Sequence, residues 1–291
     1  MRRLLLALLP VLGLAAENPQ DPPTVRIGLG AFTDQFSDAT GTWKGWVASA
    51  NWYRDASGPW SLSVAGTQRP EGRGTLAMVG KETAVGELSW LWVSAGGGTG
   101  ADFLPSFRAN VDLGLGLDAA WSLDLGGVYN RFRDGSSTTV LQAGPGWKGE
   151  AWSASLHLQQ VLYAPGGDTD TGFLLDLRWG AHNLKRWHSL RLGWGEGVLD
   201  ALQPGGSLST STTTLGGGSG RRWGTGGTST STPTSVTTTQ WVYPSVKETL
   251  VGMTHHLPVT DRLALRLDAS WGRREGQFTV WSGTLQTLVS F

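Results

Sequence analysis

The sequence predicts an all-β protein, a transmembrane antiparallel up-and-down β-barrel of about 14 strands, with 12 strands as the alternative count. Many segments alternate apolar and polar residues with a period of two, which places the two kinds of side chain on opposite faces of a strand. After the N-terminal segment, no apolar run approaches the roughly 20 residues that a membrane helix needs. The C-terminus is an alternating segment that ends on the aromatic residue Phe291. Together these observations favour a membrane protein built from strands.

The N-terminal segment is typical of a secretory signal peptide. A basic start at residues 1–3 leads into an apolar run over 4–14, which is too short to span a bilayer, and small residues follow where cleavage would occur. We therefore expect residues 1–16 to be the signal peptide and residues 17–291 to form the barrel. The sequence contains no cysteine, which argues against disulfide bonds and against a lipid anchor on cysteine.

The charge balance argues against one class of partner. The 23 basic residues are matched by 23 acidic residues, so the chain has no basic field of the kind that attracts nucleic acid. We expect no nucleic-acid partner. The 43 glycines and 16 tryptophans are unusual for a soluble protein of this size.

Alternation is cleanest in three segments, at 107–115, 173–180 and 263–271. In the last of these, the leucines at odd positions alternate with Arg266 and Asp268, so one face suits lipid and the other suits water. Alternation is weaker at 25–29, 46–52, 60–64, 88–92, 121–125 and 152–158, and weakest at 74–85, 137–147, 187–196 and 245–257. The closing segment 278–291 completes a count of 14.

Tryptophan placement separates a membrane barrel from a soluble β-sandwich, which also alternates. Trp follows a short turn at Trp60, Trp121, Trp152 and, more loosely, Trp187. Tryptophan prefers the membrane interface, where its ring is buried while its N–H stays wet, so we expect these four residues to form an interface girdle. The two tryptophans of 88–92 are likewise expected on the apolar face of their strand.

The C-terminal strand carries Val289, Leu285 and Trp281 on one face. Together with Phe291, this pattern resembles the terminal β-signal of bacterial outer-membrane proteins. We therefore expect Phe291 and Val289 to be the assembly signal, the barrel-assembly machinery and outer-membrane lipid to be the partners, and the outer membrane to be the location. If the last strand ends in the periplasm, counting backwards places the long connections outside and the short turns inside. The oligomeric state is left open.

A long Ser/Thr/Gly-rich stretch interrupts the strand pattern at about 204–243. Such a composition buries too little apolar surface to offset its ordering entropy, so we expect a disordered extracellular loop. The alternative is a receptor or adhesive patch around 221–223.

The search for chemistry finds no catalytic, cofactor-binding or metal-binding motif. His157 shares a strand face with Ser153 and Ser155, but residues two apart on a strand are too far from each other for a reliable nucleophile–base hydrogen bond. His255 and His256 are adjacent and must point to opposite faces, so they cannot bind one metal. We expect no enzyme activity. The alternative is an outer-membrane enzyme that acts on envelope lipid or polysaccharide, with His157 as its candidate catalytic residue.

Charged residues that the alternation places inward are mixed in sign. The predicted lumen charges are Arg108, Asp112, Asp124, Asp176, Arg178, Arg191, Arg266 and Asp268. They could line a weakly selective pore, or pair with one another and fill the lumen. Because opposite charges are expected on adjacent strands, as in Asp176 with Arg191 and Arg266 with Asp268, a largely charge-paired lumen is favoured.

The segment 126–195 resembles a known family. The run 127–137, with its Tyr/Arg/Phe strand end and polar loop, and the run 143–152, with its Gly-rich strand, Gly turn and aromatic restart, are similar to the YaiO-type outer-membrane β-barrel family. The Ser/Thr-rich insertion and the lack of a helical-repeat region ahead of the barrel depart from that family. The resemblance implies an outer-membrane barrel and supplies no catalytic residues. From residues and resemblance together, we expect a structural or surface protein, or a narrow passive channel.

Overall fold

The computed structural model describes residues 25–37, 41–53, 58–70, 72–164, 169–180, 186–196, 247–276 and 278–291. The predicted signal peptide at 1–16 and the predicted loop at 204–243 lie outside these residues. No helix among the described residues is long and apolar enough to cross a membrane.

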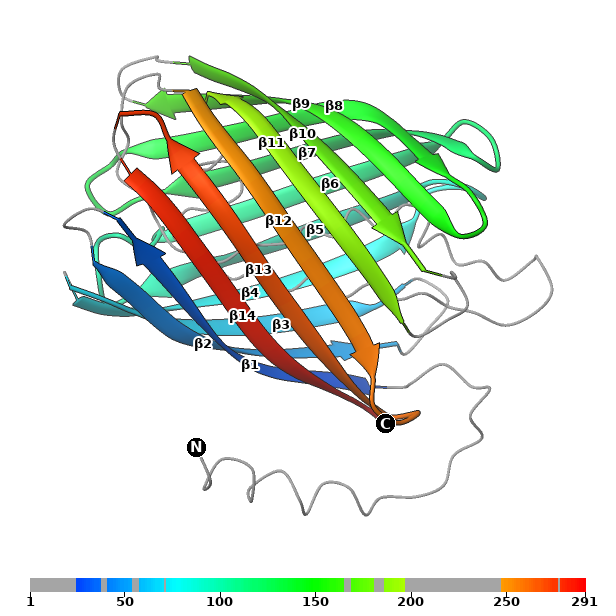
Figure 1. Ribbon diagram of the computed structural model, residues 1–291, viewed down its shortest axis with the longest axis horizontal. Coiled ribbons are helices and arrows are strands. Elements are labelled where there is room, and N and C mark those ends of the chain that lie inside the picture. Colours follow the sequence, from blue (N-terminus) through cyan, green and yellow to red (C-terminus); the bar gives the residue numbers. More distant parts are fainter. Residues whose placement is uncertain are drawn as a thin grey trace.

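Fourteen strands form one antiparallel sheet that closes on itself (Figure 1). In chain order they are β1 (Val25–Phe36), β2 (Thr42–Trp52), β3 (Trp60–Arg69), β4 (Gly72–Ala84), β5 (Trp90–Thr99), β6 (Phe107–Gly116), β7 (Trp121–Arg131), β8 (Ser137–Lys148), β9 (Trp152–Ala164), β10 (Thr169–Trp179), β11 (Trp187–Glu196), β12 (Lys247–Pro258), β13 (Leu263–Arg274) and β14 (Phe278–Ser290). Each strand pairs with its neighbours in sequence, so the connectivity is a simple meander. The predicted fold class and the count of 14 strands are confirmed, and the alternative of 12 is wrong.

The seam of the barrel joins the first strand to the last. β1 and β14 pair antiparallel from Arg26 opposite Ser290 to Phe36 opposite Val280. One end of the seam is closed by two backbone hydrogen bonds between Val25 and Phe291, with N···O distances of 3.3 and 2.8 Å. Closure leaves no unpaired sheet edge, which a strand protein needs in lipid because unpaired backbone groups are costly there.

The two faces of the sheet are reversed relative to a soluble protein, because apolar side chains face outward and polar side chains face the interior. On β9, outward Leu156 and Leu158 are exposed, whereas inward His157 and Gln159 are buried. Tryptophans on the outer face are among the most exposed apolar residues, with 63% for Trp281 and 60% for Trp194. An apolar outer surface around a polar interior is the pattern of a membrane barrel, and it disfavours the soluble sandwich.

The two ends of the barrel differ in their connections. We call the end that carries Val25 and Phe291 the termini end, and the opposite end the loop end. The strand bounds place the connections 53–59, 85–89, 117–120, 149–151, 180–186 and 259–262 at the termini end, and 37–41, 70–71, 100–106, 132–136, 165–168, 197–246 and 275–277 at the loop end. The expected length difference therefore depends mainly on the number of residues in 197–246, because only two residues separate β3 from β4 where a connection was expected at 69–74.

The predicted orientation of β5 is wrong. Trp90 and Trp92 of β5 point into the lumen, where they are 4% and 7% exposed, rather than toward lipid. Leu91 and Val93 take the outer face instead. Trp90 fits inside because Gly114, opposite it on β6, carries no side chain, and a Cβ on Gly114 would collide with the Trp90 ring.

Gly144, on the lumen face of β8, allows β8 and β9 to approach closely. A Cβ on this residue would collide with the carbonyl oxygen of Leu156 on the neighbouring strand, and backbone cannot easily move aside. Gly144→Ala should therefore destabilise the barrel by roughly 1–3 kcal/mol, measured by urea unfolding in lipid vesicles. The control is Gly283→Ala on the outer face of β14, where a Cβ would meet no heavy atom within 4 Å. Equal stability of the two variants would contradict the close approach of β8 and β9.

The turn that precedes β7 is held by Asp118, and we expect it to depend on pH. The backbone N–H groups of Ala120 and Trp121 each donate to Oδ1 of Asp118 at 2.7 Å, and these bonds, that of Ala120 foremost, lower the pKa of Asp118 below its ordinary value. Because the folded-state pKa is depressed, the contribution to turn stability is complete above the unfolded value of about 3.9 and is lost as pH falls through the folded pKa. The amide shifts of Ala120 and Trp121 should report this transition during an acid NMR titration. Asp118→Asn, which cannot titrate, should abolish the transition.

Candidate functional site

The lumen is the candidate site, because it collects charged side chains inside an apolar wall. The inward-facing basic residues of the described strands are Arg26, Arg69, Arg108, Lys148, Arg178, Arg191, Arg266 and Arg274, and the acidic ones are Asp34, Glu82, Asp112, Asp124, Asp170, Asp176, Glu248 and Asp268. The two sets are equal in number. All eight charges predicted from the sequence are inward, and so is Arg26, which the alternation also places inward. Weak alternation near the strand ends explains why the other seven were missed.

One side of the lumen is held by ion pairs. We call the inner faces of β10–β13 the paired-charge wall. Arg191 on β11 donates from Nε and one Nη to the two carboxylate oxygens of Asp176 on β10, at 2.6 and 3.1 Å, because the two residues are opposite in register. Arg266 binds Asp268 at 3.1 Å, and Thr254 donates to the same carboxylate at 2.6 Å. Arg266 and Asp268 both lie on β13, which corrects the expectation that they lie on adjacent strands.

A third pair lies nearer the loop end. Arg274 of β13 forms a buried ion pair with Glu248 of β12, its register partner. The guanidinium of Arg274 also lies 5.5 Å from the centre of the Phe278 ring. Each pair on this wall gives both charges the bonds that burial requires.

Trp187 belongs to the lumen rather than to the outer girdle. The guanidinium carbon of Arg178 lies 4.2 Å from the centre of its ring, and His256 stacks on it with a centroid distance of 5.4 Å. Arg191, four residues along the same strand, is also inward, so alternation requires Trp187 to be inward too. The expectation for Trp187 fails because β11 begins one residue out of phase with β3, β7 and β9, whose first residues Trp60, Trp121 and Trp152 face outward.

The neighbouring part of the lumen wall uses amides in place of ion pairs. We call the inner faces of β5–β9 the amide wall. Arg108 donates to the side-chain oxygens of Asn110 at 3.0 Å and Asn130 at 3.3 Å. Asn110 donates to Ser94, and Asn130 donates to Thr138. This row links β5 to β8 through residues that are opposite in register.

A second row of the amide wall lies toward the termini end. Gln142 of β8 donates to Asp112 of β6 at 3.4 Å, and Gln159 of β9 donates to Gln142 at 3.3 Å. Beside this row, Nε2 of His157 lies 3.6 Å from Oδ2 of Asp124, and the two side chains are 1% and 5% exposed. The alternation placed Asp112, Asp124 and His157 in the lumen, whereas Gln142, which joins Asp112 to Gln159, was not identified from the sequence.

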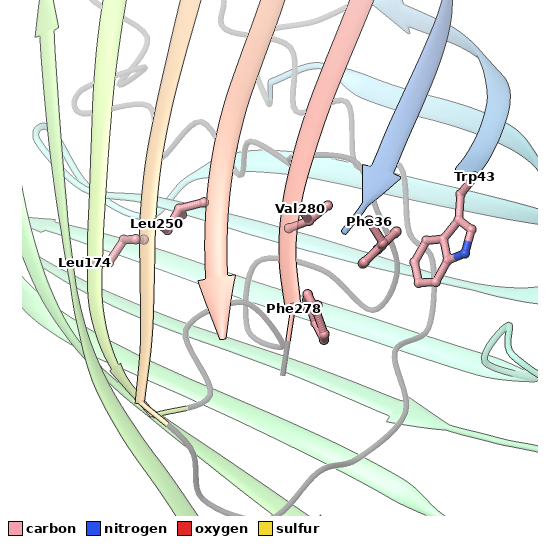
Figure 2. Close-up of a cluster of buried hydrophobic side chains, with 6 residues drawn as sticks. All are labelled: Phe36, Trp43, Leu174, Leu250, Phe278 and Val280. Carbon is pink, nitrogen blue, oxygen red and sulfur yellow. The ribbon is translucent and has the colours of Figure 1, made fainter. Parts of the chain in front are cut away.

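An apolar cluster occupies the lumen toward the loop end (Figure 2). Its members are Phe36, Trp43, Leu174, Leu250, Phe278 and Val280, all at most 7% exposed. The ring of Phe36 packs against Trp43 at 4.2 Å and against Phe278 at 5.3 Å. The guanidinium of Arg69 lies 3.6 Å from the Trp43 ring centre. Barrel interiors are ordinarily polar, so this cluster places apolar side chains, which water does not favour, inside the lumen.

The outer face carries an aromatic row near the termini end. Trp60, Trp121 and Trp152 point outward there, with 39%, 50% and 52% exposure. Trp121 is opposite Trp147, and Trp152 is opposite Trp179. Trp147 and Trp179 were missed because each ends a strand rather than starting one.

The aromatic row continues into two histidines. His188 of β11 is opposite Trp179 and packs on it at 5.8 Å. His255 of β12 is opposite His188, and their Nδ1 atoms are 2.7 Å apart. As expected, His255 and His256 lie on different faces of β12.

The residues considered for catalysis do not form a dyad. His157 has no hydrogen-bond partner on either ring nitrogen among the described residues, so neither Ser153 nor Ser155 is bound to it. In the same part of the chain, no three His, Cys, Asp or Glu side chains are grouped closely enough to hold a metal ion. The site thus shows no arrangement for nucleophilic or metal-assisted hydrolysis.

The residues of the predicted assembly signal lie on the outer face of the seam. Val289 is opposite Ile27 of β1 and Leu263 of β13, and Phe291 follows at the end of the chain. Recognition of these residues by assembly machinery stays a prediction.

Sequence comparison identifies a family. A family model described as the YaiO membrane beta barrel domain matches residues 24–197, which is more than half of the chain. No curated protein matches.

Solved structures share the fold at very low sequence identity. The CymD monoaromatic hydrocarbon channel is 8% identical, with a TM-score of 0.55 over 94% of this chain and 90% of that chain. The toluene transporter TbuX of Ralstonia pickettii is 7% identical, with a TM-score of 0.52 over 94% and 92%. A bacterial polysaccharide outer membrane secretin is 8% identical, with a TM-score of 0.53 over 93% and 100%. At such identities the likeness shows the fold alone.

The Asp176–Arg191 pair can be tested by removing one or both charges. Arg191→Met leaves a largely buried carboxylate without its main partner and should lower the free energy of unfolding by roughly 2 kcal/mol. The double variant Asp176→Asn/Arg191→Met removes both charges and should recover part of that loss. Urea unfolding in lipid vesicles measures both. The single variant Asp176→Asn completes the comparison. If the loss of unfolding free energy in the double variant equalled the sum of the losses in the two single variants, the pair would not be energetically coupled.

Proposed function

Because the chain belongs to the YaiO membrane β-barrel family and is an outer-membrane barrel, we propose that it is a narrow passive channel with a largely charge-paired lumen. The observation that carries this proposal is the composition of the lumen, where a balanced set of acidic and basic side chains lies behind an apolar wall. Ionisable groups at membrane depth are expensive and commonly mark a pathway for solutes.

The lumen also supports a low conductance. The ion pairs of the paired-charge wall and the hydrogen bonds of the amide wall hold long side chains along the inner face of the barrel, and these side chains are mostly buried. Toward the loop end, the cluster around Phe36 and Phe278 adds an apolar constriction (Figure 2). Apolar constrictions restrict flow by excluding water.

Neighbouring structures support a channel in a general way. CymD and TbuX are a hydrocarbon channel and a toluene transporter by their own descriptions. No enzyme stands among the structures compared above, and the lumen has no catalytic dyad among its described residues. The proposed partners are outer-membrane lipid around the aromatic row and the assembly machinery at Val289 and Phe291.

Purified protein in planar lipid bilayers should give small, stable current steps. Phe36→Ala/Phe278→Ala should raise the single-channel conductance several-fold, because the constriction loses two rings that pack on each other. Trp281→Ala removes an aromatic ring from the outer face of the same strand as Phe278 and should leave the conductance unchanged. Large open-pore currents from the wild type would contradict a filled lumen. Absence of current in both the wild type and the Phe36/Phe278 variant would instead favour a structural or surface protein.

A further inference from the structure

Two carboxylates of the amide wall lack the cationic partners that acids have on the paired-charge wall. Asp176, Asp268 and Glu248 each bind an arginine. Within the described residues, Asp112 and Asp124 bind no arginine or lysine: Asp112 accepts from Gln142, and Asp124 accepts from Ser122 at 3.0 Å. The pairing of the lumen is therefore incomplete on one side.

The guanidinium of Arg108 is hydrogen-bonded to residues other than these two carboxylates. Arg108 lies on the same strand as Asp112, but its printed hydrogen bonds go to the amide oxygens of Asn110 and Asn130. It acts on Asp112 only through the longer-range electrostatic attraction between them. The group of Arg108, Asp112 and Asp124 thus holds one basic side chain beside two acidic ones.

Two glycines bring the acidic side chains together with their neighbours. Gly126 lies between Asp112 and Gln142 in the strand register, and a Cβ there would be 2.7 Å from Oδ1 of Asp112. Gly144 is opposite Asp124 and adjoins the backbone of His157. Because neither glycine has a side chain, groups on β6 and β7 reach groups on β8 and β9 across the intervening strand.

Several polar atoms around the two carboxylates lack a hydrogen-bond partner among the described residues. They are Oδ2 of Asp124, both ring nitrogens of His157 and Oε1 of Gln159. These side chains are buried, with residue exposures of 4%, 1% and 3%. Unpartnered buried acceptors are costly, and His157 directs Nε2 toward the free oxygen of Asp124. The two unpartnered oxygens, Oδ2 of Asp124 and Oε1 of Gln159, can only accept, so they point to a ligand that donates a hydrogen bond or carries positive charge.

We propose that Asp112, Asp124 and Gln159 bind one small monovalent cation in the lumen, either an alkali-metal ion or the ammonium group of an amine. Carboxylate and amide oxygens suit a hard cation or an N–H donor. One positive charge on the ligand balances the second carboxylate of this group. His157 lies against Asp124 on the side away from the strand of Asp112. The role of this site in permeation, as a cation-selective point in the passage, rests on the proposed channel function, whereas binding itself does not.

The first arm of the test measures ion selectivity. Wild-type protein in a planar bilayer under a KCl gradient should favour K⁺ over Cl⁻, and Asp112→Asn/Asp124→Asn should reduce the permeability ratio by about threefold or more. The matched control Asp176→Asn/Arg191→Gln removes one acid and one base from the paired-charge wall and should keep the wild-type ratio. The two single variants provide a check if the double variant does not fold, with folding judged by heat-modifiable gel migration.

The second arm measures binding without conduction. A ligand that binds only the folded state stabilises it, so the detergent-solubilised wild type should unfold at a higher temperature in KCl than in N-methylglucamine chloride of equal ionic strength. Stabilisation by methylammonium chloride but not by KCl would identify an ammonium site, and stabilisation by KCl alone an alkali-ion site. Asp112→Asn/Asp124→Asn should lose the difference, and the control variant should retain it.

The outcomes separate the site from the channel. Conduction with unchanged selectivity in the Asp112/Asp124 variant, together with no cation-dependent stability, overturns the cation site and leaves the channel intact. Absence of conduction with cation-dependent stability that the variant loses overturns the channel and supports the site.

Discussion

The structure depends on one constraint, that every backbone N–H and C=O of a strand in lipid must find a partner within the sheet. The seam between β1 and β14 satisfies it by leaving no free edge. Closure then makes the two faces of the sheet unequal, because one surrounds a lumen and the other meets lipid. The period-two alternation of side chains follows from that difference, and so does the burial of acids and arginines behind an apolar wall.

Most of the fold could be predicted from the sequence, because a strand with one face in lipid and one in the lumen shows its orientation in every second residue. Residues 107–115 and 263–271 show this, and their inward charges lie where alternation requires. The prediction fails where tryptophan is the only guide. Trp60, Trp121 and Trp152 face outward, whereas Trp90 and Trp187 face inward, because an aromatic ring is accepted equally by the interface and by a gap beside a glycine or an arginine.

The partners of the lumen charges could not be predicted from the sequence. Asp176 meets Arg191 because a particular register sets them opposite each other, and register between strands is not encoded in either strand alone. Asp124 meets His157 across β8 because Gly144 intervenes. Residue types and alternation showed which groups are inside, but only the packed barrel divides them into a wall of ion pairs and a wall of amides.

The seam also determines when the barrel can close. Arg26 and Ser290, which meet there, are separated by 264 positions in the chain, so closing the seam has a high entropic cost and requires the last strand to be present. Until the seam forms, the outer leucines and tryptophans belong to an open sheet with two free edges. A chain that lacks β14 is thus no smaller version of the barrel but a sheet with two edges open to pairing with other strands, and the lumen exists only once the first and last strands have met.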